Sequence, residues 1–320
     1  MPVARRTVLA AAALAAALPL AAPAAAEPLA IVTTTSQIAD MARNVAGERA
    51  TVTALMGEGV DPHLYRQTRA DVAKLRNADL VLFNGLYLEA GLEDFLLELG
   101  RQQPVIALAE RLPADRLLSD EDYPDKHDPH VWMDVSLWAS LVDELEAILS
   151  EADPEGADLF AANAAAYSNE LETLDAYVRD SIASIPDNAR VLVTAHDAFQ
   201  YFGRAYDIEV MGIQGLSTES EAGLARIGEL VDLLVEREVS AVFVESSVAD
   251  RNIRALIEGA AAKGHAVGIG GELFSDAMGA PDTYEGTYVG MLDHNATVMT
   301  RALGGDAPET GLNGRLATGS

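Results

Sequence analysis

The stretch PEGADLFAANAAAYSNELETLDAYVRDSIASIP, residues 154–186, sets the architecture of this chain. Pro154 suits the first turn of a helix and Pro186 suits its end. The interior is rich in Ala, Leu and Glu and has no Gly after Gly156. This pattern predicts one helix of roughly 30 residues, about 45 Å long at 1.5 Å per residue. Because such a helix exceeds the width of a small domain, we interpret it as a rigid connector.

Short apolar or β-branched runs alternate with helical patterns on both sides of this connector. The runs read as strands, and they are 29–35, 50–56, 79–85, 104–108, 189–195, 208–213, 240–247 and 265–271. Strands that alternate with helices indicate mostly parallel sheets covered by helices. The predicted fold class is therefore α/β, with two lobes, each a mostly parallel sheet flanked by helices, joined by one long rigid connecting helix. We expect lobes at 27–153 and 187–304, and the connector at 154–186.

The two ends of the chain have a different character. Residues 1–26 contain Arg5 and Arg6, then an apolar run and a small-residue site, which is the pattern of a signal peptide cleaved after Ala26. Whether export uses the general or the twin-arginine route stays open, because an arginine pair alone is weak evidence. The last stretch, 305–320, is Gly-rich and polar and is expected to be a flexible tail.

Composition excludes several classes of protein. The net charge of −28 argues against nucleic acid as a partner, because phosphate binding needs a basic surface. The chain has no cysteine, which excludes disulfides, thiolate metal ligands, a cysteine nucleophile and a lipid-modified cysteine. Together with the signal peptide, these features predict a soluble periplasmic protein that is not lipid-anchored.

Two copies of Asp-Pro-His, in DPHLY (61–65) and DPHVW (128–132), suggest a shared site. Proline stiffens the backbone before each histidine, whereas a single Asp-Pro is also a common turn. His63 and His130 precede predicted helices, and His196 follows the strand VLVTA. Ligand sites of open α/β sheets lie beyond the carboxyl ends of the strands. We therefore predict that His63, His130 and His196 converge on one metal ion.

A fourth ligand is expected in GGELFSDAMG, residues 270–279, where Glu272 and Asp276 both remain candidates. Three neutral imidazoles and a carboxylate suit zinc. Manganese accepts the same set but usually prefers more oxygen ligands. Because protonated imidazole cannot coordinate a metal, metal-dependent stabilisation is expected to fall below about pH 6.

The other histidines are weaker candidates. His265 opens an apolar strand and His294 lies within a helix, so both are interpreted as structural. His127 lies in an acidic loop and is interpreted as a solvated residue, with metal capture as the alternative. Glu245 has two interpretations of equal weight: it supports a ligating histidine, or it caps the following helix.

Seven segments resemble, in order and spacing, the metal-binding components of manganese/zinc ABC importers, the cluster A-I solute-binding proteins, and in particular their TroA-like members. The resemblance covers nearly all the chain after the signal peptide. The segments are GVDPHLY, ADLVLFNGLYLE, DPHVWMDVSLW, VLVTAHDAFQYF, IQGLSTESEAG, VFVESSV and GGELFSDAMG followed by GTYVGM.

The resemblance implies a ligand set and partners. Its ligands fall on His63, His130, His196 and Asp276, two from each lobe, and the bound Zn²⁺ or Mn²⁺ would be cargo for an ABC-transporter permease. It also implies a monomer whose long helix limits lobe motion. Members dedicated to manganese usually carry glutamate where this chain has His196, so zinc is favoured, with manganese a close second.

Two other function classes remain open from the sequence. A metal-dependent hydrolase could use the same ligands, with Asp197 or Glu245 as a base, but it would need an open coordination position for water. A binder of organic solutes would share the architecture, but the aromatic content of 6% offers few stacking surfaces for sugars. The expected function is non-enzymatic metal capture.

Overall fold

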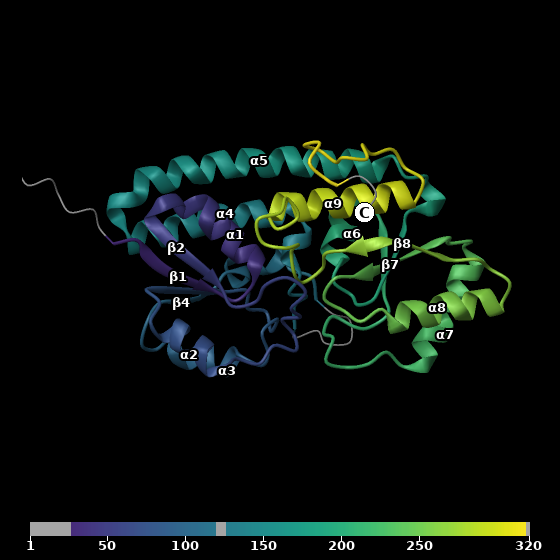
Figure 1. Ribbon diagram of the computed structural model, residues 1–320, viewed down its shortest axis with the longest axis horizontal. Coiled ribbons are helices and arrows are strands. Elements are labelled where there is room, and N and C mark those ends of the chain that lie inside the picture. Colours follow the sequence, from purple (N-terminus) through teal and green to yellow (C-terminus); the bar gives the residue numbers. More distant parts are fainter. Residues whose placement is uncertain (1–26, 120–125, 318–320) are drawn as a thin grey trace, which may run out of the picture.

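The computed structural model describes residues 27–119 and 126–317 of the chain (Figure 1). The expected signal peptide, 1–26, lies outside the described residues. No helix in the described ranges is long and apolar enough to cross a membrane.

The first lobe contains a four-stranded parallel sheet in the order β2-β1-β3-β4. Its strands are β1 (Leu29–Thr33), β2 (Ala50–Ala54), β3 (Leu80–Phe83) and β4 (Val105–Ala107). Its helices are α1 (Ser36–Ala46), α2 (Arg69–Arg76), α3 (Glu93–Leu99) and α4 (Val135–Ala152). Figure 1 shows α1 and α4 above the sheet and α2 and α3 below it. Because both faces are covered, the central strand β3 is buried along its whole length and apolar throughout.

The second lobe repeats the parallel arrangement with two strand pairs. Its strands are β5 (Val191–Thr194), β6 (Glu209–Gly212), β7 (Ala241–Glu245) and β8 (Gly268–Leu273), paired β5 with β6 and β7 with β8. Its helices are α6 (Gln200–Tyr206), α7 (Leu224–Glu236), α8 (Arg251–Ala262) and α9 (Tyr288–Ala302). Strands β5 and β7 lie next to each other. The hydrogen bond from His196, which follows β5, to Glu245, the last residue of β7, places both strand ends on the same side of the lobe. The predicted α/β class with two lobes is confirmed.

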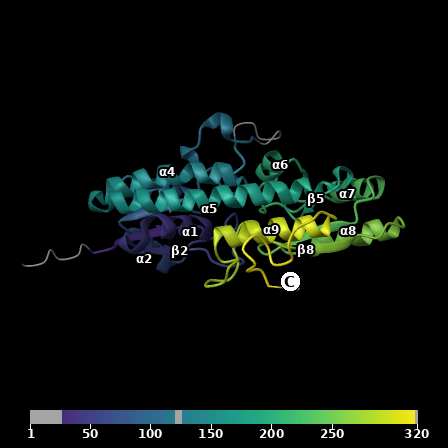
Figure 2. The same ribbon diagram turned by 90° about the horizontal axis from the view of Figure 1, so that it is seen from above.

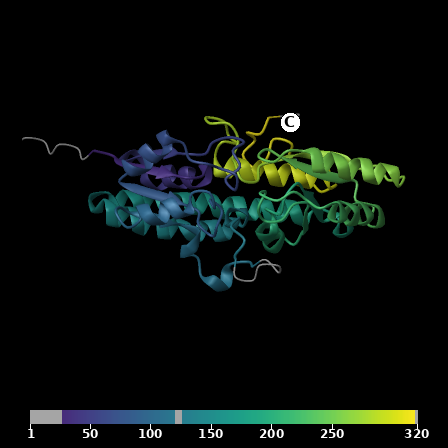
Figure 3. The same cartoon turned by 90° about the horizontal axis from the view of Figure 1, so that it is seen from below.

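The connector is helix α5 (Ala157–Ala183), preceded by a 3-10 turn at Pro154–Gly156. Figures 2 and 3 show α5 running along both lobes. It packs against α1 and α4 of the first lobe and against α6 and α9 of the second. Its inward side chains recur every three or four residues, and they include Phe160, Ala164, Tyr167, Leu171, Leu174, Val178 and Ile182. One apolar face of α5 thus packs against helices of both lobes.

The C-terminal segment corrects one expectation. Residues 305–317 pack on α9, whereas the sequence led us to expect a flexible tail from 305. The backbone N–H of Leu312 donates to Asp293 Oδ1 at 2.9 Å, and Asn313 Nδ2 donates to the Tyr284 hydroxyl at 3.0 Å. Leu316 is buried in the main core. These few apolar and hydrogen-bonding anchors order a stretch whose composition alone reads as unstructured.

Helix α9 begins at Tyr288, and Thr287 caps its first turn. The Thr287 hydroxyl accepts a hydrogen bond from the backbone N–H of Gly290 at 3.0 Å. We expect Thr287→Ala to lower the free energy of unfolding by about 1 kcal/mol, measured by urea denaturation. Thr173→Ala, in the exposed middle of α5, is the matched control and should cause no loss. Equal losses in both variants would contradict the cap.

Candidate metal centre

The four candidate ligands come from both lobes and meet between them. His63 lies in the loop after β2, and His130 immediately precedes the turn that leads into α4. His196 follows β5, and Asp276 follows β8. One ligand atom from each of these four side chains lies within 4.8 Å of the other three. The carboxyl ends of parallel strands thus converge on one point, as the strand order predicts.

The ligand atoms crowd together, and two of them are left without a hydrogen-bond partner. His63 Nε2 lies 3.3 Å from His130 Nε2. The two carboxylate oxygens of Asp276 lie 3.5 Å from His130 Nε2 and 3.4 Å from His196 Nε2. All four side chains are buried, yet His196 Nε2 and Asp276 Oδ1 have no hydrogen-bond partner among the described residues. Buried polar atoms are rarely left unpaired, so a bound cation fits this site.

Both Asp-Pro-His copies form the same local turn. Asp61 Oδ1 accepts the backbone N–H of His63, and Asp128 Oδ1 accepts the backbone N–H of His130, each at 2.9 Å. A side chain that accepts from the N–H two residues later is the bond of an Asx-turn. Sequence reasoning assigned the stiffness to proline alone and missed this function of the aspartate. The repeated Asp was the available signal.

Carboxylates hold two of the imidazoles from behind. His130 Nδ1 donates to Asp128 Oδ1 at 2.7 Å, and His196 Nδ1 donates to Glu245 Oε2 at 2.5 Å. Glu245 Oε1 also accepts the backbone N–H of His196 at 2.9 Å. These bonds turn both Nε2 atoms toward the centre, as in many metal sites. Glu245 thus supports a histidine, and the helix-cap interpretation is wrong, because the residue before α8 is Asp250.

Charge in the metal-free site is divided between the acids and two of the histidines. Burial disfavours the imidazolium of His130, but Asp128 and Asp276 outweigh burial and raise its pKa to about 9. His196 is likewise opposed by burial, while Glu245 and Asp276 raise its pKa well above the usual value. Burial lowers the pKa of His63 to about 3. Despite burial, the histidines hold the pKa of Asp276 well below its usual range. Protons therefore occupy this site when metal does not.

Two carboxylic acids beside the ligands also have raised pKa values. Burial raises the pKa of Asp197 to about 6, with a further contribution from the charge of Asp128. Burial raises the pKa of Asp61. The Thr218 hydroxyl donates a hydrogen bond to Asp61 Oδ2 at 2.6 Å, and this bond partly offsets the rise in pKa. That bond joins the loops of the two lobes next to His63.

The remaining candidates lie elsewhere. His265 Nε2 pairs with the carbonyl of Val239, and His294 Nε2 pairs with the carbonyl of Glu272. His127 Nδ1 lies 3.2 Å from the Ser119 hydroxyl, outside the four-residue cluster. Glu272, one of two fourth-ligand candidates, has an exposed side chain. Of that pair, the structure brings only Asp276 to the site.

Comparisons with known proteins agree with this geometry. The family model for the periplasmic zinc-uptake complex component A matches residues 31–302. The manganese-binding lipoprotein MntA of Bacillus subtilis is 51% identical over 277 residues, covering 87% of this chain and 90% of MntA. The zinc-binding protein TroA of Treponema pallidum is 46% identical over 273 residues, covering 85% and 88%.

Solved structures give the same result. The periplasmic zinc-binding protein TroA from Treponema pallidum superposes with a TM-score of 0.84 at 46% sequence identity, covering 86% of this chain and 99% of TroA. A second TroA structure, from work on the metal-binding specificity of TroA, gives a TM-score of 0.81 at 33% sequence identity and covers 87% of this chain. The chain therefore belongs to the zinc-uptake complex component A family, the extracytoplasmic metal-binding components of ABC importers.

Proposed function

We propose that His63, His130, His196 and Asp276 bind one divalent transition metal ion between the lobes, and that the chain delivers this ion to an ABC-transporter permease. The observation that carries the proposal is the convergence of four buried ligand atoms, two from each lobe, within 4.8 Å. An ion held in this way fixes the two lobes relative to each other, so metal binding changes the surface that the two lobes present to a partner. A permease can then distinguish the loaded protein from the empty one.

Zinc is the favoured cargo, with manganese a close second. Three imidazole nitrogens and one carboxylate give a softer ligand set than manganese usually takes. The relatives do not decide between the metals, because MntA is named for manganese and TroA for zinc. Ligand chemistry supports zinc, and both ions remain cargo candidates.

Titration of metal-stripped protein tests the proposal. Zn²⁺ and Mn²⁺ are added separately and in competition to the wild type and to His196→Glu, and binding is followed by calorimetry. We expect the four-ligand site to bind one ion per chain, with a higher affinity for Zn²⁺ than for Mn²⁺. In His196→Glu the difference between the two affinities should become smaller, because an oxygen ligand replaces a nitrogen ligand. If the protein binds neither metal, the proposed function is wrong. If the difference between the Zn²⁺ and Mn²⁺ affinities is the same in wild type and variant, His196 does not determine metal selectivity.

Glu245 offers a test of the support behind His196. We expect Glu245→Gln to weaken zinc binding about 10- to 100-fold, because the neutral amide no longer polarises the imidazole. Glu229→Gln, at an exposed position of α7, is the control with the same change in charge. Affinities are measured by competition with a fluorescent chelator. Equal affinities of the two variants would contradict a supporting role for Glu245.

A hydrolytic function is the alternative that uses the same ligands. Four protein ligands complete a tetrahedral zinc site and leave no position for an attacking water. This supports a transport protein without catalysis. Metal-loaded protein that cleaved ester or peptide substrates, and lost this activity in Asp276→Ala, would favour the alternative.

We also propose that the chain is exported, cleaved after Ala26 and active as a periplasmic monomer without a lipid anchor. The relatives named above include a lipoprotein, MntA, whereas this sequence contains no cysteine to carry a lipid. The lobe boundaries proposed for the mature chain are 27–153 and 187–304, with 154–186 as the connector. Cell fractionation, mass spectrometry of the mature protein and light scattering test location, cleavage and monomeric state.

A further inference from the structure

The segment that carries Asp276 is bonded to the first lobe as well as to its own. Asp276 belongs to the second lobe, yet its backbone carbonyl accepts a hydrogen bond from Gln37 Nε2 at 2.9 Å. The carbonyl of Ser275 accepts a hydrogen bond from Trp132 Nε1, also at 2.9 Å. Gln37 lies in the first turn of α1 and Trp132 in the turn before α4, so both donors come from the first lobe. Two consecutive carbonyls of the ligand segment are therefore held across the boundary between the lobes.

The side-chain amide of Gln37 is itself oriented by the residue before it. The Ser36 hydroxyl donates to Gln37 Oε1 at 3.3 Å, which leaves Nε2 facing Asp276. Ser36 Oγ also accepts the backbone N–H of Met278 at 3.4 Å. Because α1 packs against β2, α4 and α5, its first turn is a rigid support for residues 276–278.

Trp132 contacts ligands of both lobes. Its indole lies edge-on to the ring of His130, with the ring centroids 5.3 Å apart, while its N–H bonds the residue before Asp276. Its carbonyl accepts a hydrogen bond from the hydroxyl of Tyr288, the first residue of α9, at 2.7 Å. The second lobe thus fixes the tryptophan that holds its own ligand segment.

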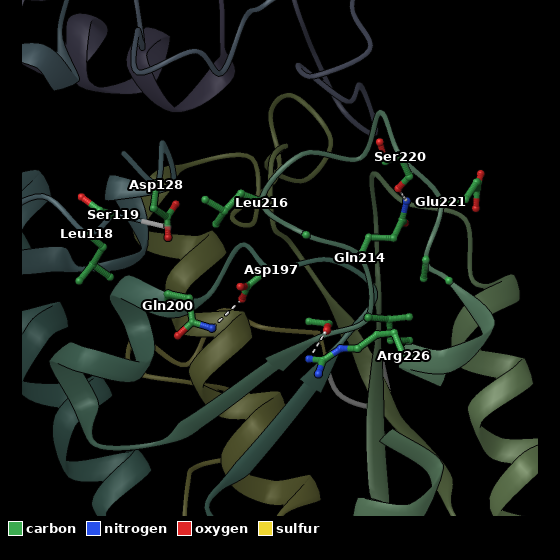
Figure 4. A pocket seen from close by; sticks show the side chains of 15 residues that line it. Leu118, Ser119, Asp128, Asp197, Gln200, Gln214, Leu216, Ser220, Glu221 and Arg226 are labelled. Carbon is green, nitrogen blue, oxygen red and sulfur yellow. Dashed lines mark hydrogen bonds between the residues drawn. The ribbon is translucent and has the colours of Figure 1, made fainter. Parts of the chain in front are cut away.

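The two bonds to the ligand segment lie in the interior of the protein. Gln37 and Trp132 are each 1% exposed, and Ser275 is 0% exposed. A polar cavity adjoins the metal centre, but the described residues that line it, such as Asp128 and Asp197, do not include either partner of these bonds (Figure 4). The cavity therefore gives water no direct route to the two carbonyls. Since a buried carbonyl that loses its donor stays unpaired, removing either donor should displace the segment.

The second lobe anchors the same segment two residues before the ligand. Asn295 of α9 accepts the backbone N–H of Phe274 at 2.9 Å and donates to the Phe274 carbonyl at 2.7 Å. At Asp276 itself, the second lobe contributes the Ser247 hydroxyl, 3.3 Å from Oδ2. The side chain that bonds the backbone of Asp276 belongs to the first lobe.

We propose that Gln37, together with Trp132, is a positioning residue for Asp276, so that the first lobe fixes a ligand that the second lobe contributes. This inference rests on the proposed function, since it concerns the same metal ion. The fourth ligand is then in place only while the lobes are docked at α1. A side chain that does not touch the metal thereby controls the metal affinity.

The test measures zinc affinity by chelator competition in wild type, Gln37→Met, Asp276→Ala and the double variant. Methionine keeps the length of the side chain but cannot donate a hydrogen bond. Gln103→Met is the matched control, because Gln103 Nε2 donates to the carbonyl of Leu75 at 2.7 Å, outside the metal centre. The visible absorption of Co²⁺ bound in place of zinc reports the coordination geometry in each protein.

We expect Gln37→Met to bind zinc at least about tenfold more weakly than wild type, and Gln103→Met to stay within about twofold. In the Asp276→Ala background, adding Gln37→Met should change the affinity by less than about twofold, because the ligand that Gln37 positions is gone. The Co²⁺ spectrum should change in Gln37→Met and stay unchanged in Gln103→Met, which a loss of stability alone would not produce.

Equal zinc affinities of Gln37→Met and Gln103→Met would overturn the inference, and so would a loss of the same size with and without Asp276. Both results leave the proposed function intact, provided that the wild type binds zinc. A wild type that binds no zinc would overturn the proposed function and the inference together.

If Gln37→Met does not fold, Trp132→Phe removes the other donor. Trp138→Phe makes the same change at an equally buried tryptophan and is its control. A loss of zinc affinity that occurs only in Trp132→Phe and disappears in the Asp276→Ala background supports the inference. No loss, or a loss that persists without Asp276, overturns it.

Discussion

Replacing Asp276 by alanine is expected to weaken zinc binding about 10²- to 10³-fold. Asp276 is the only carboxylate among the four proposed ligands, and its two oxygens lie 3.5 and 3.4 Å from the Nε2 atoms of His130 and His196. Without it, a dication would be buried among three neutral imidazoles with no negatively charged ligand in direct contact. Competition with chelators of graded affinity measures the loss in metal-stripped and reloaded protein.

Glu272→Ala is the matched control, because it removes the same kind of charge four residues away on the same segment. Its side chain is exposed, so we expect its zinc affinity to stay within about twofold of wild type. Circular dichroism of both metal-free variants checks that each remains folded. A comparable loss in the two variants would show that the segment contributes only diffuse charge and that Asp276 is not a ligand.

The fold was largely predictable because its signals are local. The strand runs and the helical spacing of 154–186 each follow from residue order alone, and all eight predicted strands are present. Element ends were less accurate. The last strand was expected at 265–271 and is found at Gly268–Leu273, where the pairing with β7 is irregular next to Val242. The sequence placed Glu272 and Asp276 together in a loop after this strand, whereas Glu272 lies within β8 and only Asp276 follows it, so the error in the strand end is what left both as candidates.

The site was predictable in its ligand types but not in its supporting contacts. Repeated Asp-Pro-His and a histidine after a strand are visible in one dimension. The bond from His196 to Glu245 joins residues 49 positions apart, and it depends on β5 and β7 lying next to each other. Nothing in the order of residues fixes that neighbour relation. The packed C-terminal segment was missed for a similar reason, since its anchor, Asp293, lies on α9.

Metal binding is expected to weaken steeply as the pH falls, and from a higher pH than the sequence alone suggested. The pKa of His130 is raised to about 9 and that of His196 lies well above 6.5, so both imidazoles hold protons at neutral pH in the metal-free site. A cation must displace those protons. Each displaced proton lowers the affinity about tenfold per pH unit, so one to two protons give about 10³- to 10⁶-fold between pH 8 and pH 5. His63, with a pKa of about 3, contributes no proton in this range.

Protonation of His130 also affects the stability of the metal-free protein, but this stability falls with rising pH, whereas the metal affinity increases. Because the folded pKa of His130 exceeds the unfolded value of 6.5, its stabilising contribution is complete below pH 6.5 and is lost as the pH rises through about 9. The metal-free protein therefore loses this contribution over the range in which zinc binds more tightly. We expect the difference in melting temperature between zinc-loaded and metal-free protein to grow from pH 5 to pH 9, with about one to two protons released on binding at pH 7. Calorimetry in buffers of different ionisation enthalpy counts those protons. A melting difference that stayed constant with pH, with no proton release, would show that histidines do not hold the metal.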